Sequence, residues 1–166
     1  MRIMTLMALT LTLMFTSPAL AADTAADRIK ANVKKIVVAE KKQVKSVTVA
    51  QFKEIMDKQE FFFELVDIRT GGEFNAGHIA GALHLDRNKL EWMTPNKIKD
   101  PDVPVFVYCK GGNRGAMSAL RLTQMGYTNV TNITGGIKAW ANAGYPLYNL
   151  LGEFRITQDG FEKKPE

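Results

Sequence analysis

The chain has 166 residues, which is enough for one domain with a proper hydrophobic core. Its contents of 46% hydrophobic and 23% charged residues are typical of globular proteins. The net charge of +5 is only mildly basic, and no nucleic-acid-binding motif accompanies it. We therefore expect a globular protein without a nucleic-acid partner.

The first 21 residues have the pattern of a secretory signal peptide. Arg2 precedes an apolar run over residues 3–15, and the small-residue sequence Ala19-Leu20-Ala21 follows it, so cleavage is expected after Ala21. The apolar run is shorter than the roughly 18 to 20 residues that a membrane-spanning helix needs. We therefore expect an exported, periplasmic protein whose mature form is soluble and has no transmembrane segment.

The next segment, residues 22–43, is rich in lysine and predicts an amphipathic helix at residues 25–42. Its apolar residues recur at helical spacing, at Ile29, Val33, Ile36 and Val37. The lysines are explained either as a solvated helix face or as a surface that docks an anionic partner.

From residue 44 onward, strand-like segments alternate with helix-like segments. Apolar runs predict strands at residues 47–49, 61–67, 81–85, 105–108 and 130–133. Helices are predicted at residues 50–58 behind a Thr48 cap, around Leu90 and Trp92, at 115–125 and at 137–142. A turn-rich connection is predicted at residues 95–104. This alternation indicates a single α/β domain with a central parallel sheet and helices on both faces.

The core domain is expected at residues 44–150, and residues 151–166 form a C-terminal tail. Three apolar residues of the tail are expected to pack on the domain, namely Leu151, Phe154 and Ile156. Trp92 and Trp140 are expected in the core or over the sheet.

Cys109 is the single cysteine of the chain. Exported proteins commonly use cysteines in pairs, as disulfides, which one cysteine cannot form within the chain. An odd cysteine indicates a reactive thiol or an intermolecular bond, and the alternative is an inert core thiol.

The sequence around Cys109 favours a reactive thiol. The predicted strand 105–108 ends immediately before it, and the loop Lys110-Gly111-Gly112-Asn113-Arg114 leads into a helix. A tight turn there would aim backbone N–H groups inward, and the helix N-terminus would add positive potential. No Asp or Glu occurs between residues 103 and 152, so Cys109 is flanked in sequence by positive charge only. These features stabilise a thiolate.

Two other loop chemistries fit less well. A protein phosphatase loop has Cys-x5-Arg, whereas Arg114 follows Cys109 after four residues. A thioredoxin-like redox pair needs a second cysteine at position 112, which is Gly112.

Three motifs in order resemble the rhodanese family over about residues 44–150. The first contains Val66-Asp67-Ile68-Arg69, then Glu73-Phe74, then Gly77-His78-Ile79-Ala80-Gly81-Ala82; the second is the loop 109–114; the third runs from Gly135-Gly136 through Trp140 to Pro146. The sequence departs from the family at Ala80, where proline is usual, and at Gly71-Gly72, where a polar pair is usual.

This resemblance implies a sulfurtransferase that carries sulfur as a persulfide on Cys109. Thiosulfate or a persulfide would donate the sulfur, and cyanide or a thiol would accept it. Backbone amides from Lys110 to Arg114 would hold the outer sulfur, and the Lys110 and Arg114 side chains would attract an anionic donor. No cofactor beyond the covalent persulfide is implied.

The remaining polar residues are assigned structural support. Asp67 and Arg69 are expected to make hydrogen bonds near the loop, and His78 is expected to orient its own turn. With two histidines and one cysteine in the chain, we expect no metal site.

Two hypotheses on function therefore stay open. The first is an enzyme that turns over by two-step exchange through Cys109. The second is a carrier or binding module that holds sulfur for a partner redox protein, with the lysine-rich segment as its docking surface.

Overall fold

The computed structural model of the chain describes residues 24–157 and 160–163. The predicted signal peptide, residues 1–21, lies outside these residues. Side chains are described up to residue 157.

A five-stranded parallel sheet forms the centre of the domain, in the order β1-β5-β4-β2-β3. Its strands are β1 (Lys45–Thr48), β2 (Glu64–Asp67), β3 (Leu83–His84), β4 (Val105–Tyr108) and β5 (Val130–Thr134). The middle strand β4 is buried along its whole length and coincides with its prediction. Its neighbour β2 is in register with it so that Asp67 lies opposite Tyr108.

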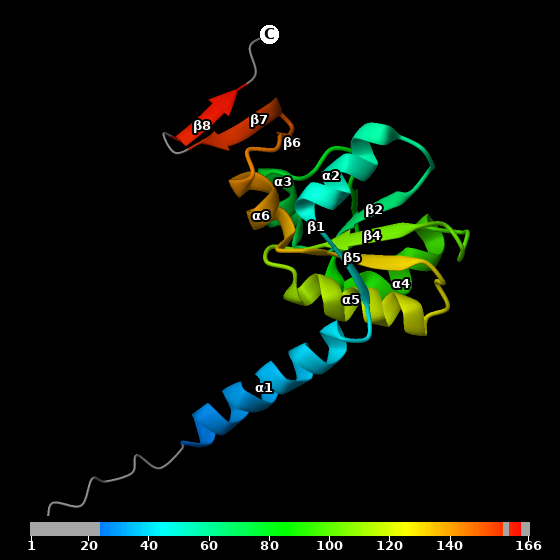
Figure 1. Cartoon of the computed structure of the whole chain (residues 1–166), viewed down its shortest axis with the longest axis vertical. Helices are drawn as coiled ribbons and strands as arrows, with labels where there is room; N and C mark the ends of the chain where they lie inside the picture. Colours follow the sequence, from blue (N-terminus) through cyan, green and yellow to red (C-terminus); the bar gives the residue numbers. More distant parts are fainter. Residues whose placement is uncertain (1–23, 158–159, 164–166) are drawn as a thin grey trace, which may run out of the picture.

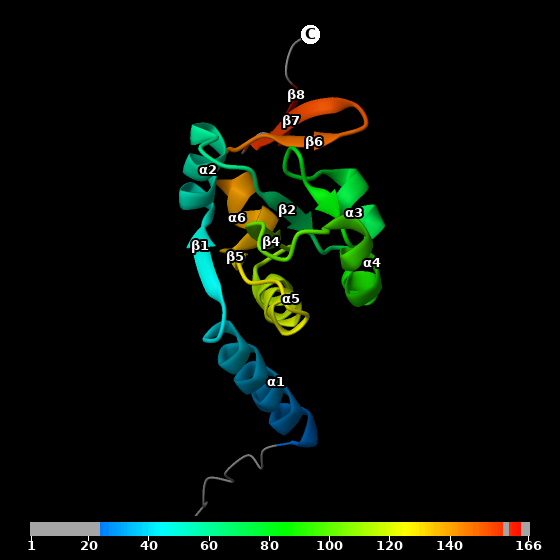
Figure 2. The ribbon, with the colours of Figure 1, turned by 90° about the vertical axis from the view of Figure 1, so that its right-hand side faces the viewer.

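Helices cover both faces of the sheet, which confirms the predicted α/β fold (Figures 1 and 2). Helices α4 and α5 lie on one face, and α2 and α6 lie on the other. Their bounds are α2 (Val49–Lys58), α3 (Gly71–Ala76), η1 (Arg87–Lys89), α4 (Leu90–Lys97), α5 (Asn113–Gln124) and α6 (Gly136–Asn142). Thr48 caps α2 as predicted, because its hydroxyl accepts from the Gln51 N–H.

Alternation along β4 divides the core into two layers, since successive side chains of a strand point to opposite faces. Val105 and Val107 pack with α4 and α5, whereas Phe106 and Tyr108 pack with α2 and α6. Cys109 follows in the same alternation and lies with the first layer.

Several local predictions for the core domain were wrong. The apolar run 61–67 forms a strand only from residue 64. Phe62 lies before the first residue of this strand, outside the sheet, and is 73% exposed. Residues 95–97 belong to α4 rather than to the turn-rich connection. The helix continues past Pro95, because the Ile98 N–H donates to the Thr94 carbonyl at 2.8 Å. Trp140 is buried as expected, but Trp92 is 78% exposed on the outer side of α4.

Helix α1 (Ala25–Lys41) ends one residue before its predicted boundary and projects from the domain (Figure 1). None of its residues is buried, and its apolar stripe, including Ile29 and Val33, faces solvent. Its C-terminal part lies beside α5. In the described part of the chain, no helix has both the length and the apolar character needed to cross a membrane.

The C-terminal segment forms a second, antiparallel sheet, which the sequence reading did not predict. Its strands are β6 (Leu147–Asn149), β7 (Gly152–Thr157) and β8 (Gly160–Lys163), in that order. Phe154 is buried in the core layer of α6, as expected for the tail. Leu151 is not packed as expected, because it occupies the β6–β7 turn and is 79% exposed.

Gly77 allows β7 to pack closely on the domain. A Cβ at Gly77 would lie 2.6 Å from Cζ of Phe154, well inside van der Waals contact. The backbone of Gly77 is extended, so the requirement for glycine is one of space rather than of dihedral angle.

We predict that Gly77→Ala lowers the free energy of unfolding by about 1–3 kcal/mol, because the added methyl group displaces the Phe154 ring. Urea unfolding followed by circular dichroism measures the change. Gly72→Ala is the control, since no atom beyond its chain neighbours and its own helix backbone lies within 4 Å of a Cβ at Gly72. Equal stability of the two variants would contradict the proposed packing.

Candidate active site

The active loop, residues 109–114, lies at the carboxyl end of the central strand β4. Strand β4 ends at Tyr108, and α5 begins at Asn113 behind a Gly112 N-cap in the left-handed region (φ 92°). Ligands of parallel α/β sheets bind at this edge.

The thiol of Cys109 is enclosed by its own loop. Cys109 is 1% exposed, and its Sγ accepts a hydrogen bond from the Gly112 N–H at 3.1 Å. The first-turn amides of α5 have no acceptors within the helix and add positive potential at this end. This geometry stabilises negative charge on Sγ, or on an atom bonded to it.

The start of α6 clamps the loop from behind. The amides of Ile137 and Lys138 donate to the carbonyl oxygens of Cys109 and Lys110, at 2.8 and 3.1 Å. In a planar trans peptide, the N–H points opposite to the C=O. The amides of Lys110 and Gly111 are therefore turned away from α6, as an anion-binding turn requires.

A cavity of about 300 Å³, called here the active cavity, opens over the loop. It is lined by Cys109, Lys110, Gly111, Asn113, Arg114 and Lys138. All five predicted loop residues thus lie around Cys109. Four of them line the cavity, and the N–H of the fifth, Gly112, donates a hydrogen bond to Sγ. Lys138 was not predicted as a site residue. The signal that could have identified it is its positive charge within residues 103–152, which contain no Asp or Glu.

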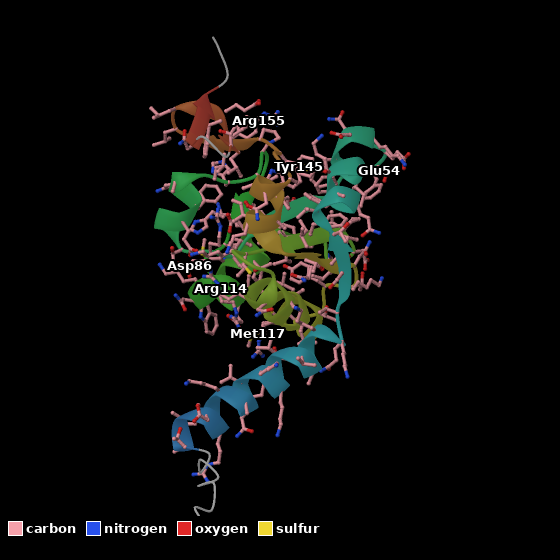
Figure 3. All side chains as sticks on the ribbon, turned by 60° about the vertical axis from the view of Figure 1, so that its left-hand side comes forward. Glu54, Asp86, Arg114, Met117, Tyr145 and Arg155 are labelled. Carbon is pink, nitrogen blue, oxygen red and sulfur yellow. The ribbon has the colours of Figure 1, made fainter. Side chains whose placement is uncertain are left out.

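Arg114 carries an ion pair that the local sequence did not reveal. The guanidinium of Arg114, which is labelled in Figure 3, donates to the Glu73 carboxylate at 3.1 and 3.3 Å. Glu73 also completes the capping box of α3 with Thr70. The Arg114 hydrogen bond, reinforced by Thr70, lowers the pKa of Glu73 to about 2. Among the described residues, Lys110 and Lys138 have no such ion pair, so they hold the uncompensated charge of the cavity.

Asp67 and Arg69 form a buried pair beneath the loop. The Arg69 Nε lies 2.9 and 3.0 Å from the two Asp67 oxygens, and its Nη2 lies 2.6 Å from Oδ2. Arg69 Nη2 also donates to the Gly77 carbonyl at 2.7 Å. Neither side chain lines the active cavity. The hydrogen bonds of Arg69 to Asp67 and Gly77 connect the end of β2 to the loop before β3.

His78 lies away from Cys109, in the loop between α3 and β3. Its ring stacks on Phe74 with centroids 4.0 Å apart, and its backbone pairs with Tyr148 of β6. Its predicted role, orienting this turn, stays a prediction. No group of three potential metal ligands occurs in the described part of the chain.

The lysine-rich helix reaches the active loop at one point. Lys41 Nζ, at the end of α1, donates to Asn113 Oδ1 at 3.2 Å. The contact brings the C-terminal end of α1 to the rim of the active cavity.

A protein-family model described as the rhodanese-like domain matches residues 48–143. The chain belongs to the rhodanese-like family. The matched segment contains the whole active loop and most of both core layers, but it ends before β6.

Several curated relatives of this rhodanese-like protein are named sulfurtransferases. A sulfurtransferase of Allochromatium vinosum is 41% identical over 83 residues, covering 50% of this chain and 76% of that protein. The thiosulfate sulfurtransferase GlpE of Tolumonas auensis is 40% identical over 82 residues, covering 49% and 74%. These matches support membership of a sulfurtransferase family.

Solved structures extend the likeness. A polysulfide-sulfur transferase homodimer from Wolinella succinogenes is 25% identical, with a TM-score of 0.64 over 76% of this chain and 93% of that one. A protein of unknown function from Rhodopseudomonas palustris, described as a possible tyrosine phosphatase, is 30% identical, with a TM-score of 0.62 over 69% and 92%. In the present chain, the loop keeps the shorter Cys-x4-Arg spacing.

We predict that Arg69→Met lowers the free energy of unfolding by about 3–5 kcal/mol, because Asp67 is left as an unpaired buried charge. Chemical unfolding measures the loss. The double variant Asp67→Asn with Arg69→Met should recover much of it. Arg87→Met is the control, since it removes a half-exposed ion pair with Glu91. A loss no larger than that of the control would show that the buried pair is unimportant.

We predict a pH-dependent role for Glu73. Because its folded pKa is lowered to about 2 from 4.5, its stabilisation is complete above pH 4.5 and is lost as the pH falls toward 2. Both partners are partly exposed, so the contribution is about 1 kcal/mol. Glu73→Gln should remove this part of the acid dependence, as measured by unfolding between pH 2 and 6.

The matched control for Glu73 is Glu54→Gln, which breaks the exposed pair with Lys58 on α2. It should leave the acid dependence nearly unchanged. An identical pH profile for Glu73→Gln and the unmodified protein would contradict the role of the Arg114 pair.

Proposed function

We propose that this protein moves sulfane sulfur from thiosulfate or a persulfide donor to a thiophilic acceptor, through a persulfide on Cys109. The observation that carries the proposal is the position of the Cys109 Sγ. It lies under a cavity lined by three cationic side chains, Lys110, Arg114 and Lys138, and it already accepts a backbone N–H.

In the first step, the thiolate of Cys109 attacks the outer sulfur of thiosulfate. A sulfur–sulfur bond forms to Sγ while the bond inside thiosulfate breaks, and sulfite leaves with its electron pair. Lys110 and Lys138 attract the dianion and balance the charge on the leaving sulfite. The outward-turned amides of the loop hold the transferred sulfur.

In the second step, cyanide or a thiolate attacks the outer sulfur of the persulfide. The electron pair of the breaking bond returns to Sγ, and the acceptor leaves with the sulfur. Because the two substrates use the same cysteine in turn, we expect a ping-pong exchange. The sulfur stays covalently bound throughout, so the chemistry requires no cofactor.

The named relatives support the reaction class, and the polysulfide-sulfur transferase supports anionic sulfur chains as alternative donors. With the signal-like residues 1–21, we place this activity outside the cytoplasm, in the periplasm. A free thiolate there is prone to oxidation, and regular sulfur loading would protect it.

We predict that thiosulfate adds one sulfur atom to the purified protein, which intact mass spectrometry detects. A thiol should remove the added sulfur, and Cys109→Ala should not acquire it. Ser118→Ala is the control, because Ser118 is buried on α5 away from the active cavity. Absence of the adduct with thiosulfate and with polysulfide would overturn the proposed function.

A second candidate, a sulfur carrier for a partner redox protein, is favoured by the contact between Lys41 and Asn113. A partner bound along the lysines of α1 would lie next to the loaded cysteine. The distinguishing measurement is turnover with small acceptors. Repeated cycles with cyanide or thiols favour the enzyme, whereas stable loading with a single slow discharge favours the carrier.

A further inference from the structure

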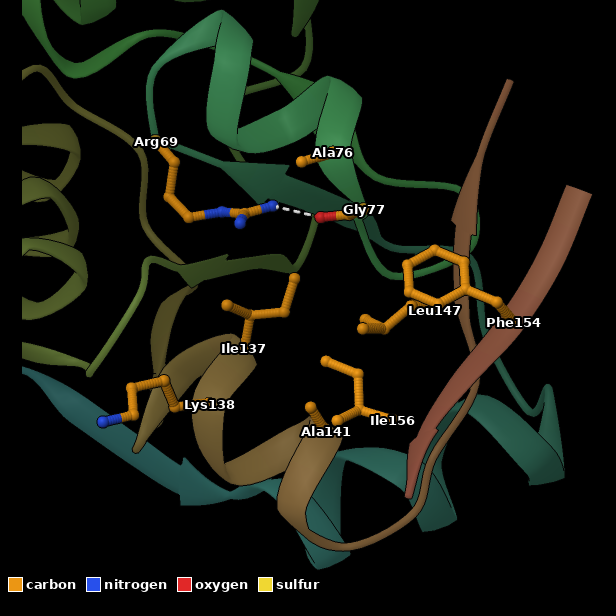
Figure 4. Close-up of a pocket in the computed structure, with 9 residues that line it drawn as sticks. All are labelled: Arg69, Ala76, Gly77, Ile137, Lys138, Ala141, Leu147, Phe154 and Ile156. Carbon is orange, nitrogen blue, oxygen red and sulfur yellow. Dashed lines mark hydrogen bonds between the residues drawn. The ribbon is translucent and has the colours of Figure 1, made fainter. Parts of the chain in front are cut away.

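A second cavity, called here the hairpin pocket, adjoins the active site between α6 and β7. It has a volume of about 260 Å³. Its apolar lining comes from α3, α6, β6 and β7 (Figure 4), through Ala76, Ile137, Ala141, Leu147, Phe154 and Ile156.

The hairpin pocket offers no free charge at its inner end. Arg69 lines it, but the Arg69 guanidinium is already bound to the Asp67 carboxylate and the Gly77 carbonyl (Figure 4). A charged group at that end would be poorly solvated and unpaired, which is costly. The pocket therefore favours an uncharged, apolar occupant.

The pocket and the active cavity share one wall. Lys138 lines both, and in Figure 4 its ammonium points away from Leu147 and Phe154. Ile137, on the pocket side, donates its N–H directly to the Cys109 carbonyl at 2.8 Å. A ligand lying along the aliphatic stem of Lys138 could thus extend from one cavity into the other.

Part of this pocket comes from outside the segment that matches the rhodanese-like family. Leu147, Phe154 and Ile156 follow residue 143, where the match ends. Its volume lies just below the roughly 300–1,000 Å³ of pockets for drug-sized ligands, so its occupant is small.

We propose that the hairpin pocket binds the aliphatic chain of a thiol acceptor while the sulfur of that thiol attacks the Cys109 persulfide. This inference rests on the proposed sulfurtransferase function and adds the chemical class of the acceptor. A small dianion such as thiosulfate gains nothing from an apolar wall, whereas a carbon chain does. In a two-step exchange, the acceptor enters after the donor has left, so the pocket is available to it.

The transfer step is balanced as a thiol exchange. The thiolate R–S⁻ attacks the outer sulfur of Cys109–S–SH, the bond to Sγ breaks, and R–S–SH leaves. The electron pair goes to Sγ, which becomes a thiolate, and the proton stays on the outer sulfur. In the reverse direction, the alkyl persulfide donates its outer sulfur to Cys109. The pocket would therefore bind the same carbon chain in both the thiol and the persulfide.

The test separates loading from discharge. Protein loaded with sulfur from thiosulfate or polysulfide is freed of excess donor and mixed with ethanethiol, butanethiol or hexanethiol. Loss of the Cys109 persulfide is followed by mass spectrometry. Each methylene that enters the pocket should raise the second-order rate constant roughly fourfold. Hexanethiol should also react faster than 6-mercaptohexanoate, whose charged end would face the uncharged wall.

Ile156→Asn should remove the dependence on chain length, because Ile156 lines the pocket and is 44% exposed, so its loss spares the core. Leu151→Asn is the matched control, since Leu151 lies in the turn between β6 and β7 but does not line the pocket. Discharge by cyanide, which has no chain, should be the same in all three proteins. This equality checks that the active loop is intact.

The outcomes are distinct. A protein that never takes up sulfur overturns the proposed function, and this inference with it. A protein that loads and reacts with cyanide, but discharges to all three alkanethiols at equal rates, overturns the inference alone. Retention of the chain-length dependence by Ile156→Asn would also overturn it.

Discussion

Backbone contact between the active loop and the turn at Gly135-Gly136 is the constraint on which the site depends. A Cβ at Gly136 would lie 2.2 Å from the Cys109 carbonyl oxygen, and one at Gly112 would lie 2.8 Å from the Gly135 amide nitrogen. All three glycines have φ in the left-handed region. Only main chain fits between the two turns. Their proximity lets α6 bind the loop carbonyls, and the loop amides then face the active cavity.

The charges around this loop are divided by depth. In the buried interior, Asp67 and Arg69 neutralise each other, and Arg69 also binds the Gly77 carbonyl. At the side, Glu73 orients Arg114 and removes part of its charge. At the mouth, Lys110 and Lys138 stay exposed to solvent. An incoming anion therefore meets long, mobile cations first, whereas the groups nearest the chemistry are fixed dipoles.

Most of the fold and the centre of the site could be predicted from the sequence, because they depend on local patterns. The run at residues 105–108 specified a buried strand, and the glycines after Cys109 specified the turn. Glu73 belongs to the first of the three motifs, but the motif does not indicate its ion pair with Arg114, which lies 41 positions away in the sequence. Such a contact depends on tertiary packing, which no local pattern encodes.

The C-terminal sheet was missed for a related reason. Strands β7 and β8 belong to the small antiparallel sheet with β6 and not to the central parallel sheet. Residues 151–163 accordingly lack the continuous apolar run that is typical of a buried central strand. The burial of Phe154 further depends on the space left by Gly77, which lies in another part of the chain. The amphipathic pattern of α1 was easier to identify, and the pattern alone did not indicate that α1 would pack against α5.

Helix α6 connects the active loop with the segment that follows it. Its N-terminal amides bind the Cys109 and Lys110 carbonyls, and the Trp140 indole donates to the Pro146 carbonyl at 2.8 Å, just before β6. The carbonyl groups of the loop are bound by the backbone of α6, whereas β7 packs against α6 side chains. Substitutions in β7 can therefore reshape the hairpin pocket while the geometry at Cys109 stays fixed. A domain built this way can change its acceptor without changing its sulfur chemistry.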